Sequence, residues 1–174
     1  MKRAILTLTA LAAFGQVTYE RLLKASQEPK NWMTYSGAYN GWRHSTLTQI
    51  NRDNVDKLKV AWVYQMPITE RIEATPLVVD GVMYVSGPNQ VFAIDGRSGR
   101  TIWHYQRPRS AEAKGDPAKG TNRGVAILGD QVFLVTDNAR LLSIHRVSGQ
   151  LLWERRITEG VTDARNLGNT AAPL

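Results

Sequence analysis

Cysteine and histidine, the residues best suited to thiol and metal chemistry, are scarce in this sequence. None of its 174 residues is a cysteine, so a disulfide, a thiolate metal site, a lipid-modified cysteine and a covalently attached haem are excluded within it. The three histidines, His44, His104 and His145, have no paired spacing that would place two of them on one element. We therefore predict no histidine metal site in this stretch.

The charge balance is basic but diffuse. There are 22 Lys and Arg against 15 Asp and Glu, a formal charge of +7. The cations are spread along the chain and not gathered on one segment, which argues against a nucleic-acid partner. With 43% hydrophobic and 21% charged residues, the chain is too apolar to be disordered, so we expect a folded domain or a piece of one.

The N-terminus follows an export pattern. Lys2 and Arg3 precede an apolar run that ends at Phe14, and the small residue Gly15 comes next. This run is too short for a permanent membrane anchor, which needs about 20 apolar residues. We predict a cleaved signal peptide over 1–15 and no transmembrane anchor; the alternative is a buried amphipathic helix.

Residues 16–60 are expected to form a short helix followed by an irregular strap. Leu22 and Leu23 contribute to an apolar pattern at helical spacing, and Pro29 closes that segment. Residues 31–49 are rich in Tyr, Trp, Gly, Ser, Thr and Asn without a clear period. This composition favours an irregular strap laid over a larger body.

From residue 61 onward the sequence is typical of an antiparallel β-meander. Short β-branched and aromatic runs alternate with turn residues. Asp80-Gly81 suits a type I′ hairpin, because both positions tolerate positive φ. The pattern predicts two units of four strands each, at 75–79, 82–86, 90–95 and 101–106, and at 124–128, 132–136, 141–145 and 151–155.

An internal repeat relates the two units. Residues 93–103 match residues 143–153, with a glycine and a tryptophan at the same spacing. Trp62, Trp103 and Trp153 recur at intervals that fit the roughly 40 to 50 residues of a four-stranded propeller blade. The repeated glycine suits a turn with positive φ, and the tryptophan suits packing between neighbouring blades. We predict an all-β fold in which residues 61–174 form an incomplete β-propeller, about two blades and the start of a third.

The repeat Ala-x-Asp-x-x-x-Gly-x-x-x-Trp over 93–103 resembles the tryptophan motif of quinoprotein dehydrogenases. The similarity to the PQQ-dependent alcohol dehydrogenases runs from about Asn31 to Leu174, and it is most specific in short motifs: Asn31–Gly37, Tyr39–Gly41, Arg43, Ser45, Leu47, Ile50–Val55, Arg71–Pro76 and Asn122–Ala126.

This resemblance implies the N-terminal part of an eight-bladed propeller and a periplasmic location. It also implies oxidation of alcohols by hydride transfer to PQQ, with Ca²⁺ or a lanthanide ion beside the cofactor. A c-type cytochrome or a similar protein is the expected electron acceptor.

Three residues match positions that contact PQQ in the family. The guanidinium fork of Arg123 can hold a carboxylate or quinone oxygen, and the hydroxyl of Thr170 can donate to a cofactor carboxylate. Glu73 would repel a tricarboxylate unless it is protonated or accepts a ring N–H. A surface ion pair for Arg123 and an ordinary strand position for Thr170 are the alternatives.

The sequence departs from the family where many relatives carry two adjacent cysteines, because Pro117 and Ala118 stand there. The family's metal-ligating Glu and Asn and its Asp base belong to later blades, beyond residue 174. The resemblance therefore predicts neither a catalytic nor a metal-ligating residue in this chain, and no activity of the chain on its own.

Two other interpretations stay open. A non-enzymatic propeller scaffold, resembling the outer-membrane assembly lipoproteins, would need the same glycine and tryptophan positions, although those proteins carry a lipid-modified cysteine. Alternatively, a truncated reading frame would explain why residues 170–174 echo the start of the strand at 74–77 and then stop.

Overall fold

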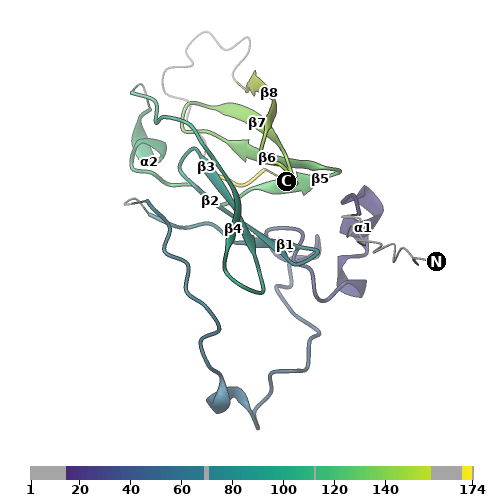
Figure 1. Cartoon of the computed structure of the whole chain (residues 1–174). Coiled ribbons are helices and arrows are strands. Elements are labelled where there is room, and N and C mark those ends of the chain that lie inside the picture. Colours follow the sequence, from purple (N-terminus) through teal and green to yellow (C-terminus); the bar gives the residue numbers. More distant parts are fainter. Residues whose placement is uncertain (1–14, 69–70, 112, 158–169, 174) are drawn as a thin grey trace, which may run out of the picture.

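The computed structural model describes residues 15–68, 71–111, 113–157 and 170–173. Its centre is two four-stranded antiparallel sheets in the orders β1-β2-β3-β4 and β5-β6-β7-β8, which stand side by side (Figure 1). The strands are β1 (Leu77–Val79), β2 (Val82–Gly87), β3 (Gln90–Asp95) and β4 (Thr101–Gln106), then β5 (Ala126–Leu128), β6 (Gln131–Val135), β7 (Arg140–His145) and β8 (Leu151–Arg156). Each sheet is one blade, so the predicted all-β, partial propeller fold is confirmed.

Turn chemistry fixes the hairpins. Asp80 and Gly81 have φ of 51° and 83°, both positive as the predicted type I′ turn requires, and they join β1 to β2. The connection between β6 and β7 spans residues 136–139. There Ala139 takes a φ of 55°, and its N–H donates to the carbonyl of Thr136 at 3.1 Å.

An apolar core joins the two blades. One face of the first blade, with Leu77, Tyr84 and Ala93 side by side across β1, β2 and β3, is at most 1% exposed. It belongs to the same buried cluster as Leu134 and Leu142 of the second blade, which are 0% exposed. Full burial of one such side chain contributes about 1.5–3 kcal/mol to stability. The core therefore holds the blades to each other as well as each sheet together.

The repeated tryptophan and glycine meet across the blade boundary. The indole of Trp103, on β4, lies over Gly149 of the second blade, so closely that a Cβ on Gly149 would come 2.8 Å from a ring atom. The indole N–H of Trp103 also donates to the carbonyl of Arg146 at 2.9 Å. The predicted role of the tryptophan, packing between neighbouring blades, is confirmed.

Trp62 repeats this arrangement one unit earlier. A Cβ on Gly99 would come 2.7 Å from its ring, and its indole N–H donates to the carbonyl of Gly96 at 3.1 Å. Trp62 lies in an extended segment outside the named strands. Trp153 continues the series on β8 and is 36% exposed.

The N-terminal segment is attached to both blades. The predicted short helix is present as α1 (Tyr19–Leu23), followed by the 3₁₀ turn η1 (Ala25–Gln27). Thr18 caps α1 by accepting a hydrogen bond from the N–H of Arg21 at 3.2 Å. Isolated bridges pair Val17 with Gly129 and Trp32 with Val78. Among the described residues, no helix has the length and apolar character needed to cross a bilayer. The predicted signal peptide, 1–15, lies almost wholly outside the described residues.

The strap covers the body only in its first part. Met33 is 2% exposed and belongs to the core, whereas Trp42 is 77% and Val60 is 80% exposed. Between them the chain runs away from the sheets as an open loop that contains the 3₁₀ turn η2 (Val55–Lys57) (Figure 1). The strap therefore lies on the body near Met33, whereas the loop does not. Both faces of the first blade already have other partners, the second blade and the segment around Trp62.

A long connection joins β4 to β5 and contains one helical turn, α2 (Gly115–Ala118), which the sequence did not lead us to expect. Gly115 has a φ of 66°, and Pro117 lies in the first turn, where its missing N–H costs no hydrogen bond.

Candidate functional site

Three segments from distant parts of the chain meet just before the first strands of the blades. The N–H of Thr75 donates to the carbonyl of Arg123 at 3.4 Å, and the N–H of Arg123 donates to the carbonyl of Thr170 at 2.9 Å. Gly124 has a φ of 138°, and a Cβ on it would come 3.4 Å from the Cβ of Ala172. Glycine is needed there because few other residues adopt this backbone conformation.

The three residues predicted from the family resemblance come together at this point. Nη2 of Arg123 lies 3.4 Å from Oε2 of Glu73, and Nη1 of Arg123 donates to Oγ1 of Thr170. The side chains of Arg123 and Glu73 are 41% and 34% exposed. The cluster is therefore open to solvent on one side and can meet a ligand without a change of fold.

The electrostatics of this cluster favour exchange of partners. One guanidinium faces one carboxylate, and ion pairs as exposed as this one contribute only about 0–1 kcal/mol. Arginine has five N–H donors in a fixed fork, and Glu73 and Thr170 each approach one terminal nitrogen. A carboxylate ligand can therefore compete for Arg123 at little cost.

A buried amide fixes the backbone on which Arg123 stands. Asn122 is 4% exposed, and its Oδ1 accepts from Oγ of Ser86 at 2.6 Å and from the N–H of Gly124 at 3.1 Å. Its Nδ2 donates to the carbonyl of Val135 at 3.3 Å. Asn122 thus links the turn to β2 of one blade and β6 of the other. Sequence reasoning included Asn122 only in a family motif and gave its side chain no role, although an asparagine two residues before a glycine is a turn signal.

None of the histidines belongs to this cluster. His104 stacks on Phe92 with ring centroids 4.0 Å apart, and burial lowers its pKa below the usual value. Nδ1 of His145 lies 2.8 Å from Oγ of Ser148 in the β7–β8 turn. His44 is exposed in the strap loop. Within the described ranges, no three His, Cys, Asp or Glu side chains gather closely enough to hold a metal ion.

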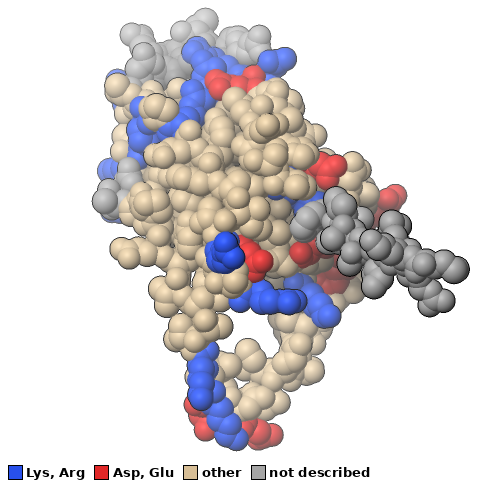
Figure 2. Space-filling model, viewed as in Figure 1, with Lys and Arg blue, Asp and Glu red and all other residues tan. Residues whose placement is uncertain are grey.

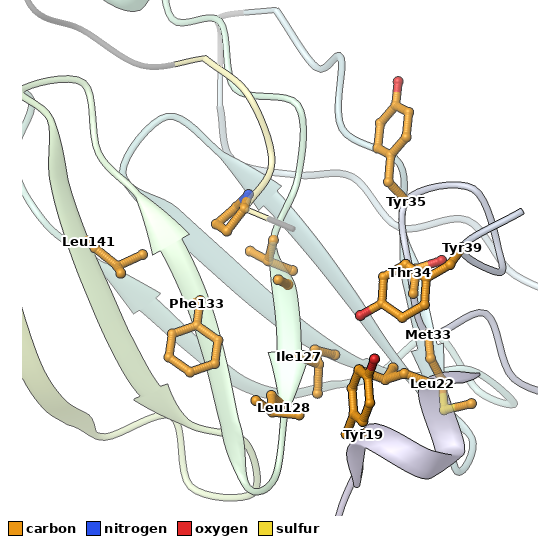
Figure 3. Close-up of a pocket in the computed structure, with 13 residues that line it drawn as sticks. Tyr19, Leu22, Met33, Thr34, Tyr35, Tyr39, Ile127, Leu128, Phe133 and Leu141 are labelled. Atoms are coloured by element: carbon orange, nitrogen blue, oxygen red, sulfur yellow. The ribbon is translucent and has the colours of Figure 1, made fainter. Parts of the chain in front are cut away.

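An apolar cavity of about 280 Å³ lies between α1, the strap and the second blade. Figure 3 shows Tyr19 of α1 and Tyr39 of the strap on the side of the cavity opposite Ile127, Leu128 and Phe133. The residues that line it carry no charge. The cavity is therefore unsuited to an anionic ligand and is distinct from the Arg123 cluster.

Charges elsewhere are dispersed. On the face in Figure 2, basic side chains lie in several separate groups, and acidic side chains lie near most of these groups.

Comparison with known proteins decides the family. The profile of the family described as the β-propeller domain of PQQ-dependent glucose, ethanol and alcohol dehydrogenases matches residues 32–166. The chain belongs to this family. It is 41% identical over 138 residues to the quinohemoprotein alcohol dehydrogenase ADH-IIG of Pseudomonas putida, covering 76% of this chain and 19% of that protein. It is 39% identical over 145 residues to the 1-butanol dehydrogenase (cytochrome c) of Thauera butanivorans, covering 82% and 20%.

Solved structures agree with the sequence matches. The structure of ADHIIG from Pseudomonas putida HK5 superposes with a TM-score of 0.83 at 37% identity, over 93% of this chain and 24% of that one. A europium-containing methanol dehydrogenase superposes with a TM-score of 0.74 at 28% identity, over 89% and 27%. The chain thus spans about a fifth of the length of the curated relatives it matches. These matches favour the dehydrogenase interpretation over the non-enzymatic scaffold.

Proposed function

We propose that this chain supplies the first blades of a periplasmic PQQ-dependent alcohol dehydrogenase, and that Arg123, Thr170 and Glu73 contact the cofactor. The observation that carries this proposal is the convergence of these three side chains, from segments about 50 residues apart, in a chain of the PQQ family.

The residues present suit part of such a cofactor. PQQ is a planar quinone with three carboxylates, and the Arg123 fork can donate two parallel charged hydrogen bonds to one carboxylate or to a quinone oxygen. Thr170 adds a hydroxyl donor beside it. Glu73 fits if it is protonated or accepts a ring N–H. One cation cannot balance three carboxylates, so these residues form only part of a cage.

When bound, PQQ would supply the oxidising chemistry, as the acceptor of a hydride from the alcohol, with Ca²⁺ or a lanthanide ion beside it. The residues of this chain would bind the cofactor and orient it. Arg123 would hold one edge of the ring system, and Gly124, which has no side chain, allows the close approach of Ala172 beside the Arg123 backbone. The base and the metal ligands are expected outside this stretch, so the chain alone is expected to be inactive and to bind PQQ weakly or not at all.

The substrate class and the electron acceptor follow the relatives. One relative is a 1-butanol dehydrogenase linked to cytochrome c, and a structural neighbour is a europium-containing methanol dehydrogenase. They support a small alcohol as substrate, a c-type cytochrome as partner, and either Ca²⁺ or a lanthanide as metal. The export pattern at 1–15 supports the periplasm.

A transplant tests the proposal. Residues 32–173 replace the matching stretch of ADH-IIG from Pseudomonas putida, and alcohol oxidation is measured with PQQ, metal ion and an artificial electron acceptor. We expect activity that depends on added PQQ and falls at least tenfold in Arg123→Ala. Arg97→Ala, an exposed arginine in the β3–β4 turn, is the matched control. A folded transplant without PQQ-dependent activity would contradict the proposal.

A further inference from the structure

A buried carboxylate ties the long β4–β5 connection to both blades. The side chain of Asp137, in the β6–β7 turn, is 2% exposed. Its Oδ1 accepts from Nδ2 of Asn89 at 2.9 Å, and its Oδ2 accepts from Nε of Arg109 at 2.8 Å and from the N–H of Ser110 at 2.9 Å. The N–H of Asp137 in turn donates to Oδ1 of Asn89 at 2.9 Å. Asn89 lies in the β2–β3 turn, so equivalent turns of the two blades are joined reciprocally.

Arg109 connects Asp137 to α2. Its Nη2 donates to the carbonyls of Pro117 and Ala118, at 2.5 Å and 3.2 Å. These carbonyls belong to the last residues of α2, where a helix leaves its carbonyls without intrahelical partners, and the carbonyl of Pro117 also accepts from the N–H of Gly120 at 3.0 Å. A cation is the suitable donor at that end. Arg109, which Asp137 orients, therefore helps to hold this single turn, together with the N–H groups of residues 119–121 that donate to α2 carbonyls.

The path from α2 to Arg123 is short and closed by hydrogen bonds. The N–H of Thr121 donates to the carbonyl of Asp116 at 3.2 Å. Thr121 and Asn122 are 5% and 4% exposed, and Asn122 is held by Ser86 as described above. Because these contacts hold the residues between α2 and Arg123, we expect a displacement of α2 to move the guanidinium of Arg123 as well.

We propose that Asp137 is a positioning residue for Arg123. Its carboxylate orients Arg109, and Arg109 holds the end of α2. The position of α2 in turn fixes the position of Arg123 in the site. The chain has no cysteine with which to brace this loop, and the Asp137–Arg109 pair braces it by charge. The effect on PQQ rests on the proposed function, whereas the effect on the loop does not.

Amide hydrogen exchange, measured on the full chain, tests directly whether Asp137 holds the loop. The N–H groups of residues 119–121, 123 and 124 all donate in the structure. In Asp137→Asn, which replaces one acceptor oxygen with an amide donor, we expect these amides to exchange at least tenfold faster while those of β2, β3 and β7 keep their rates. Arg109→Gln should act alike, and the double variant should be no worse than Asp137→Asn. Asp116→Asn, which removes the exposed pair with Lys119 on the same turn, should leave the rates unchanged.

Titration of the transplant with PQQ gives the functional reading. We expect Asp137→Asn to weaken PQQ binding about tenfold and Asp116→Asn to leave it unchanged. Equal acceleration of exchange throughout both blades would show that Asp137 only stabilises the fold, and unchanged exchange at 119–124 would overturn the proposal outright. If the parent transplant binds no PQQ, the proposed function fails while the exchange rates still decide the role of Asp137.

Discussion

Replacement of Gly149 by alanine probes the docking of one blade on the next. Two costs add at this position. The φ of 73° is unfavourable for a residue with a Cβ, which costs about 1–2 kcal/mol. The new methyl would also come 2.8 Å from the Trp103 ring, and overpacking of this kind costs about 1–3 kcal/mol. Trp103 cannot move away easily, because it is 9% exposed and its indole N–H is bonded to the Arg146 carbonyl.

We therefore expect Gly149→Ala to lower the free energy of unfolding by about 2–5 kcal/mol, a large part of the 5–15 kcal/mol that a typical domain has. The matched control is Gly129→Ala in the same blade. Gly129 has a φ of 60° but no atom within 4 Å of its Cβ position, so only the backbone cost of about 1–2 kcal/mol applies. Urea unfolding of the transplant, followed by tryptophan fluorescence, measures both. Equal losses in the two variants would refute the packing of Trp103 on Gly149.

Three further predictions concern side chains. Arg123→Ala should weaken PQQ binding by about 1.5–3 kcal/mol, the value of a charged hydrogen bond; titration would show no change if Arg123 makes only a surface ion pair. Glu73→Gln should change stability by no more than about 1 kcal/mol, because its pair with Arg123 is exposed; a larger loss in urea unfolding would contradict the openness of the site. Burial lowers the folded pKa of His104, so its contribution to stability is complete above the ordinary pKa of about 6.5 and is lost as the pH falls from there through the lower folded pKa. His104→Phe should flatten this part of the stability profile, and an unchanged profile would assign the pH dependence to other groups.

The strand pattern could be predicted closely where turn residues mark both ends. The strands at 90–95 and 101–106 were predicted at their observed bounds, because turn residues flank them. The first strand is shorter than predicted, since Thr75 donates its N–H to Arg123 and Pro76 has none to offer the ladder. The local sequence pattern does not show which backbone groups hydrogen-bond to a distant segment instead of to a neighbouring strand.

The site required more than local pattern. Glu73, Arg123 and Thr170 lie too far apart in sequence for spacing to relate them, and the family resemblance alone suggested that they meet. Asp137 lies between the predicted strands 132–136 and 141–145, and this position indicates only a turn. Its partner Asn89 is 48 positions away, and a hydrogen bond between equivalent turns of two blades becomes visible only once the blades are packed.

The account's central claim is that Arg123 binds the cofactor, and a crystal structure of the transplant with PQQ tests it most directly. We predict a guanidinium nitrogen of Arg123 about 2.7–3.2 Å from a carboxylate or quinone oxygen of PQQ, with Thr170 Oγ1 beside it. Bound PQQ out of reach of Arg123, with the guanidinium still paired to Glu73, would contradict it.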